Sequence, residues 1–135
     1  MDRLALPILA SVALCACSSA GQTYRAPAEG EHAEIRGYYR NFLVAADEIS
    51  FDLVSADNQE LVAFVKRAKV EPGRYCVRAR RWTMFLRGSD MQMSDTACFD
   101  AEGGHIYRIR RREDGFAIID RKDPTVVSLA PAEQT

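Results

Sequence analysis

The stretch Arg74-Tyr75-Cys76-Val77-Arg78-Ala79-Arg80 decides the fold class, because its apolar side chains stand at every second position. Successive side chains of a β-strand point to opposite faces, so a period of two places one column in a core and the other outside it. The same alternation recurs in residues 49–53 and 107–110, and another short apolar run opens at Phe116 and Ile118. The chain is therefore expected to be all-β, with strands that bury one face.

Turn-forming residues separate these runs at short intervals. Glycine supplies a positive φ at no steric cost, and Asn and Asp tolerate it. The turn signals are Asp57-Asn58, Pro72-Gly73, Gly88-Ser89-Asp90, Gly103-Gly104, Asp114-Gly115 and Asp123-Pro124. About seven to nine short strands with such spacing predict a small antiparallel β-sandwich or a partly open barrel.

Residues 59–69 fit two interpretations. Their apolar side chains follow a helical spacing, with Asn58 as a cap and basic residues near the end. A strand is preferred because Val62, Phe64 and Val65 are β-formers. Asp57-Asn58 then forms a hairpin turn after the preceding strand.

The N-terminus is predicted to be an export signal. Its apolar run from Leu4 to Leu14 is eleven residues long, whereas a membrane span needs about twenty and the core of a signal peptide about 7 to 15. The following Leu14-Cys15-Ala16-Cys17 resembles the bacterial lipobox, with Leu three residues before the modified cysteine and a small residue directly before it. The alternative is an ordinary cleaved signal peptide with a coincidental cysteine.

The lipobox resemblance implies cleavage before Cys17 and lipid on its thiol, including a palmitate-type acyl chain. Two or more acyl chains anchor a protein stably, whereas one binds marginally. Cys15 would leave with the signal peptide. Ser18 is not the aspartate that retains such proteins at the inner membrane, so the resemblance favours the outer membrane, facing the periplasm.

Four segments are expected along the chain. Residues 1–16 form the lipoprotein signal peptide, 17–32 a lipidated flexible tether, 33–129 one β-sandwich domain, and 130–135 a disordered tail. The formal net charge is −1, so bulk charge indicates neither nucleic acid nor a strongly acidic partner.

A family resemblance covers about residues 35–120. The segments that carry it are Tyr38-Tyr39-Arg40, residues 49–53, residues 70–75 with Pro72-Gly73, and residues 101–107 with Gly103-Gly104 and Tyr107. Together they resemble small β-sandwich lipoproteins of the DUF2846-like kind. The resemblance implies a sandwich fold and an envelope location, and it implies no catalytic residues.

Cys76 and Cys98 are expected to form a disulfide. After the assignment of Cys15 and Cys17 they remain as an even pair in an exported, oxidising compartment. The alternation places both thiols away from the apolar columns. The alternative is that they are two unrelated small apolar residues.

Catalysis and metal binding find little support in the sequence. No Gly-x-Ser-x-Gly turn is present to expose a nucleophile, and acids such as Asp120 stand beside turns, where solvated capping is usual. Weak candidates for Cu(I) ligands are Met84, Met91, Met93 and His105. Methionines at strand spacing are more often core residues, so no enzyme activity, cofactor or metal is predicted.

Arginines supply the remaining functional hint. Two sets project from alternating strands: Arg74, Arg78 and Arg80, and Arg108, Arg110 and Arg112. On neighbouring strands they would form an arginine comb for lipopolysaccharide phosphates, anionic headgroups or peptidoglycan carboxylates. The alternative is a solvated face paired with acids such as Asp100 or Glu113. The sequence thus predicts a non-catalytic structural or interaction module of the envelope, with copper binding and anion binding as alternative functions.

Overall fold

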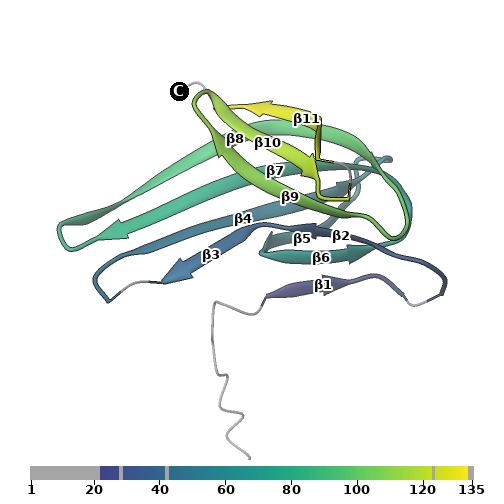
Figure 1. Ribbon diagram of the computed structural model, residues 1–135, viewed down its shortest axis with the longest axis horizontal. Helices are drawn as coiled ribbons and strands as arrows, with labels where there is room; N and C mark the ends of the chain where they lie inside the picture. The colour runs from purple at the N-terminus through teal and green to yellow at the C-terminus, as the bar shows by residue number, and fades with distance from the viewer. Residues whose placement is uncertain (1–21, 28, 42, 123, 134–135) are drawn as a thin grey trace, which may run out of the picture.

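Two β-sheets pack face to face in the computed structural model, which describes residues 22–27, 29–41, 43–122 and 124–133 (Figure 1). This part of the chain contains eleven strands. They are β1 (Thr23–Arg25), β2 (Ala33–Arg36), β3 (Tyr38–Asn41), β4 (Ala46–Ser55), β5 (Glu60–Val65), β6 (Arg67–Val70), β7 (Gly73–Phe85), β8 (Gly88–Ala101), β9 (Ile106–Arg112), β10 (Gly115–Asp120) and β11 (Thr125–Pro131). Among the described residues there is no helix long and apolar enough to cross a membrane.

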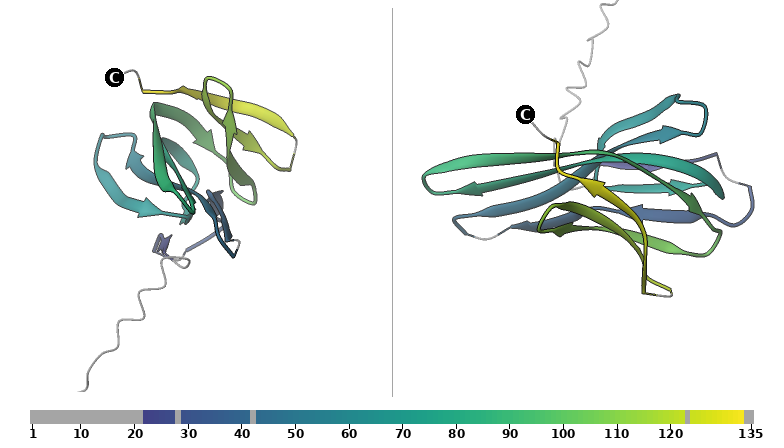
Figure 2. Two further views of the ribbon diagram at one scale, coloured as in Figure 1. Left: turned by 90° about the vertical axis from the view of Figure 1, so that its left-hand side faces the viewer. Right: turned by 90° about the horizontal axis from the view of Figure 1, so that it is seen from above.

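The first sheet has the order β1-β6-β2-β9-β10-β11, and the second has the order β3-β4-β7-β8 with β5 beside β4 (Figure 2). The all-β sandwich is thereby confirmed. The sheets are not purely antiparallel, since β1 runs parallel to β6 and β2 runs parallel to β9. Both parallel pairs join segments far apart in sequence, which local turn signals do not report.

The core lies between the sheets and follows the predicted alternation. The alternating apolar residues that become buried are Ile49, Phe51, Leu53, Val77, Ala79, Tyr107, Ile109, Phe116 and Ile118. Tyr75 is half-buried and packs against this cluster. The period of two therefore identified the inward faces of four strands correctly.

Residues 59–69 form strands β5 and β6, as preferred over a helix. Asn58 takes the left-handed conformation with φ 60°, which closes the hairpin between β4 and β5. Phe64 also has a positive φ of 56°, and its N–H donates to an Asp52 carboxylate oxygen at 3.1 Å. A kinked strand explains why the apolar spacing here imitates a helix.

Two connections pass from one sheet to the other at a shared corner. Gly37 alone joins β2 to β3, and Lys66 alone joins β5 to β6. The Gly37 N–H donates to the Lys66 carbonyl oxygen at 2.8 Å. A Cβ on Gly37 would lie 2.0 Å from the Ile49 carbonyl oxygen, so only glycine allows this close approach.

The predicted disulfide is present between Cys76 of β7 and Cys98 of β8. The two residues are direct partners in the β7–β8 ladder. With a sequence separation of 22, the closed loop is expected to stabilise the fold by about 3 kcal/mol in the chain-entropy model.

The ends of the domain differ from the predicted boundaries. Residues 23–25 of the expected tether form β1, and Ala130 of the expected tail is a buried residue of β11. Glu133 extends this end by donating its N–H to the Met93 carbonyl oxygen at 2.9 Å. The predicted signal peptide, Cys15 and Cys17 lie outside the described residues.

One turn was misplaced. Gly88-Ser89-Asp90 opens β8, and the hairpin turn before it is formed by Leu86 and Arg87. A glycine is suited to this first position of β8 because its φ of 151° is a conformation that other residues avoid. The turns at Asp57-Asn58 and Gly103-Gly104 are where they were predicted.

Gly37→Ala tests the corner. The added methyl group must displace the Ile49 carbonyl oxygen from the β3–β4 ladder, so we expect a loss of stability of about 2 kcal/mol or more. Urea denaturation monitored by circular dichroism would measure it. An unfolding midpoint equal to that of the unsubstituted protein would show that the two strands do not need this close approach.

Candidate functional site

The arginine comb requires β7 and β9 to be neighbouring strands, and they lie in different sheets. β7 belongs to the second sheet and β9 to the first. The β7 arginines are instead paired on the second sheet: Arg80 with Asp52, Arg78 with Glu133 at 2.8 Å, and Arg74 with Asp100 at 3.4 Å. Arg80 is also buried and stacks over the Phe64 ring at 3.8 Å. The pair of Arg74 with Asp100 agrees with the alternative interpretation of a solvated face paired with acids, whereas the buried Arg80 does not.

A different row of arginines crosses the first sheet. Arg36 of β2 is in register with Arg67 of β6 on one side and with Arg108 of β9 on the other. Direct partners in a ladder have their Cβ atoms about 5 Å apart, so three guanidinium groups share one row. Arg110 lies two residues further along β9, on the same face as Arg108.

This row borders a cleft of about 680 Å³ at the Gly37 corner. Because β2 leaves the first sheet at Gly37, the second half of β9 has no strand partner on that side in the described part of the chain. The cleft opens there, between β9 and the strands β3, β4 and β7. Its lining residues are Gln22, Thr23, Arg36, Gly37, Tyr38, Tyr39, Asp47, Ile49, Lys66, Arg67, Arg81, Arg108, Ile109, Arg110 and Arg111. A cleft of this volume is large enough for a small molecule.

Positive charge dominates the cleft. Seven of its lining residues are Arg or Lys, whereas Asp47 is its single carboxylate. Asp47 pairs with Arg81 at 3.0 Å, and Lys66 pairs with Glu48 at 3.2 Å.

Like Glu48, Glu34 is a carboxylate outside the lining that pairs with cations of the cleft. It lies 3.0 Å from Arg36 and 3.1 Å from Arg67. Among the described residues, the seven cations of the cleft thus have three carboxylates as partners, which leaves an excess of four positive charges. Within the described residues no ion pair is made by Arg108, Arg110 or Arg111.

The positive charge of the cleft shifts the pKa values of two groups, Arg108 and Glu34. Burial lowers the pKa of Arg108, and the charges of Arg121, Arg110 and Arg36 lower it further. Burial would raise the pKa of Glu34, but the hydrogen bond from Arg36 and the surrounding cations outweigh it and lower the pKa. The site therefore disfavours additional positive charge and favours negative charge.

Tyrosine and lysine side chains shape the wall opposite β9. Tyr38 and Tyr39 of β3 are partly exposed, and the Lys66 ammonium lies 4.7 Å from the centre of the Tyr39 ring. Lys66 itself is buried at the corner, with 8% of its side chain exposed. The wall combines phenol hydroxyls with cations, which are all donors to an anion.

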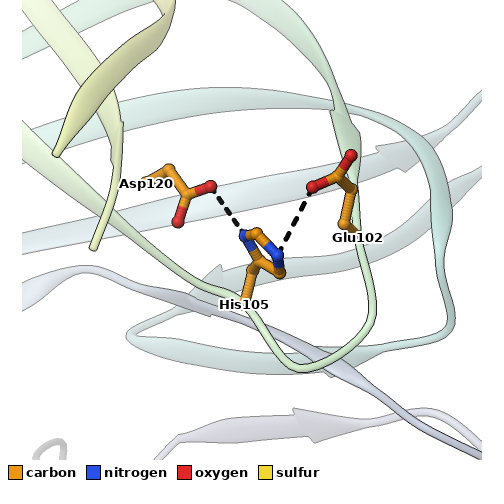
Figure 3. Close-up of side chains that lie close together, drawn as sticks. All are labelled: Glu102, His105 and Asp120. Carbon is orange, nitrogen blue, oxygen red and sulfur yellow. Dashed lines mark hydrogen bonds and ion pairs between the residues drawn. The ribbon is translucent and has the colours of Figure 1, made fainter. Parts of the chain in front are cut away.

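A second polar cluster lies beyond the far end of β8, as Figure 3 shows. His105 Nδ1 is 2.7 Å from an Asp120 carboxylate oxygen, and His105 Nε2 is 3.4 Å from Glu102. Asp120 is buried rather than a solvated cap, and its other oxygen accepts the Lys122 N–H at 3.0 Å.

This cluster ties the turn before β9 to the end of β10. The arrangement Asp120–His105 is one that orients an imidazole toward a metal ion. Glu102, His105 and Asp120 each place a ligand atom within 4.8 Å of the others, but Asp120 is bonded to Nδ1 of His105, which leaves Nε2 and the exposed carboxylate of Glu102 for an ion. Two ligands form an incomplete site, so we assign the cluster a structural role.

The weak candidates for copper ligands do not come together. Met91 and Met93 are partners of Trp82 and Arg80 in the β7–β8 ladder, and Met84 is further toward the hairpin turn. Met93 precedes the end of β8 at Ala101 by eight residues, a strand length of roughly 25 Å. His105 lies beyond that end, so it cannot share one ion with these methionines.

The comparisons with known proteins give no relative. No family model, no curated protein and no solved structure matches the chain. The resemblance to DUF2846-like lipoproteins stays a prediction.

Sequence reasoning found part of the cleft. Arg108 and Arg110 were selected because they alternate with Tyr107 and Ile109, and both line it. Arg112 ends β9 outside it. Arg36 and Arg67 were missed because the neighbours of β9 follow from sheet order. Arg36 does alternate with Ile35, a local signal that could have found it.

Glu34→Gln tests the charge balance through pH. A carboxylate with a lowered pKa stabilises the fold above its ordinary pKa of 4.5 and loses that contribution as the pH falls through the folded value. The variant should be less stable by roughly 1 kcal/mol at pH 7. The difference should stay constant down to about pH 5 and shrink below it. Thermal unfolding at several pH values would check this, and a difference that grows with acidification would contradict it.

Proposed function

We propose that the protein is a non-catalytic binding module of the cell envelope, which holds an anionic ligand in the arginine cleft. The observation that carries the proposal is the excess of four positive charges around one cleft in a chain whose net charge is −1. Cations gathered around one cleft repel one another, and a bound anion would offset that repulsion.

Arginine indicates the chemistry of the ligand. Its planar fork donates two parallel hydrogen bonds to a phosphate or carboxylate group. Three arginines without ion pairs among the described residues, Arg108, Arg110 and Arg111, are available to donate them. Envelope lipids carry phosphate groups, and peptidoglycan carries carboxylate groups.

Binding rather than turnover is the role that the lining residues favour. They contain no histidine, cysteine or serine, and their one carboxylate, Asp47, is paired with Arg81. The tyrosines and arginines donate hydrogen bonds to a bound anion without needing to transfer a proton.

A lipid on Cys17 is the proposed anchor. The support for it is the lipobox-like sequence Leu14-Cys15-Ala16-Cys17. Export also accounts for the Cys76–Cys98 disulfide, which an oxidising compartment preserves.

Tripolyphosphate, a soluble polyanion, can probe the cleft. We expect calorimetric binding that weakens with salt and falls at least tenfold, about 1.4 kcal/mol, in a variant carrying Arg108→Gln and Arg110→Gln. Glu34→Gln should bind more tightly, because it removes a competing carboxylate. Protein in neutral detergent micelles is suitable for the measurement.

The matched control carries Arg74→Gln and Arg78→Gln. It loses the same charge from the second sheet, where both arginines are paired. Equal weakening in the two variants would mean that net charge rather than the cleft binds the anion, and the proposal would fail.

Cys17→Ala tests the anchor. We expect the unsubstituted protein to incorporate labelled palmitate and to fractionate with envelope membranes, because its acyl chains enter the bilayer. The variant should incorporate no label. Labelling that persists in the Cys17→Ala protein would place the lipid elsewhere.

A further inference from the structure

Two hairpins carry exposed apolar residues toward the same end of the molecule. The β3–β4 and β7–β8 hairpins project together in Figure 1 and in the right view of Figure 2. Leu43 and Val44 stand between β3 and β4, and Leu43 is fully exposed. Phe85 and Leu86, at the β7–β8 turn, are 63% and 81% exposed. We call these four residues the apolar tips.

Exposed apolar side chains gathered at one end need a reason, since single ones are ordinary but clusters mark interaction sites. Met84 and Met91 add partly exposed apolar surface beside the β7–β8 turn. Arg87 stands in that turn, between Leu86 and β8. Apolar side chains with a flanking cation are suited to a membrane interface with anionic headgroups.

The arginine cleft lies directly beside the tips. Asn41, Ala46 and Met84 are register partners at the end of β3, β4 and β7. Asp47, which follows Ala46, and Tyr39, two residues before Asn41, both line the cleft. A bilayer that received the tips would therefore have its headgroups near the cleft.

The chain before β1 limits how far the cleft can be from a lipid on Cys17. Gln22 and Thr23 line the cleft, and Cys17 stands only five positions before Gln22. Five residues span at most about 18 Å even when fully extended. The pairing of β1 with β6 thus replaces the long tether expected from sequence by a short one.

We propose that the apolar tips enter the bilayer interface and that the arginine cleft takes the phosphate headgroup of an anionic phospholipid in the leaflet that holds the Cys17 lipid. This inference rests on the proposed function, for both the anchor and the anion site. It adds the identity of the ligand and the orientation of the domain on the membrane.

A tryptophan placed at a tip can report its depth. Trp82 is the single tryptophan, so a protein with Trp82→Phe and Leu86→Trp carries its only indole at the β7–β8 turn. The lipidated protein is reconstituted into phosphatidylcholine vesicles with or without phosphatidylglycerol, with brominated acyl chains as quenchers. We expect blue-shifted, quenched emission that is greater with phosphatidylglycerol.

Two comparisons make the result specific. Adding Arg108→Gln and Arg110→Gln should lower quenching in phosphatidylglycerol vesicles to the phosphatidylcholine level, whereas Arg74→Gln with Arg78→Gln should leave it unchanged. A protein with Trp82→Phe and Leu129→Trp places the indole on β11, at a site 60% exposed, and should not be quenched.

Two results would overturn the inference. One is absence of quenching at position 86 while tripolyphosphate still binds the cleft, which would leave the proposed function intact. The other is emission at position 86 that depends on protein concentration and not on the lipid, because a second copy of the chain would then cover the tips. If the unsubstituted protein did not bind tripolyphosphate, the proposed function itself would be refuted.

Discussion

The close contact at Gly37 is the constraint on which the rest of the structure depends. Its N–H bonds to Lys66 while its Cα faces the Ile49 carbonyl oxygen, at a distance that no Cβ permits. Through this corner β2 becomes β3 and β5 becomes β6, so four strands are distributed between two sheets. The same crossing leaves the second half of β9 without a partner and so opens the cleft.

Charge in this protein is arranged locally rather than in bulk. Although the net charge is −1, seven cations line one cleft. On the second sheet, the largely buried side chains of Arg80 and Asp52 form an ion pair. Burial strengthens interactions between charges because the surroundings screen them less. Among the described residues, Glu34 is the carboxylate that pairs with both Arg36 and Arg67, so it stabilises the row and would compete with the proposed anion.

The sequence predicts the strands better than their neighbours, because alternation is local and sheet order is not. Val77, Ala79, Tyr107 and Ile109 were placed correctly in the core, and the partnership of Cys76 with Cys98 followed from counting. In the parallel pairs β1–β6 and β2–β9 no tight turn connects the two strands, so no local turn signal predicts the pairing. The arginine row depends on those pairs, so the sequence indicated arginine as the chemistry and only one of the strands that carry it, β9.

Strand β1 connects the fold to the proposed location. It is only three residues long and occupies the edge of the first sheet, beside β6, where few contacts hold it. Its pairing nevertheless fixes Gln22 and Thr23 at the cleft. The proposed lipid on Cys17 stands only five positions before Gln22, so it would keep the cleft nearer to the bilayer than the opposite edge at β11. The position of a short edge strand thus decides which face of the domain a membrane would meet.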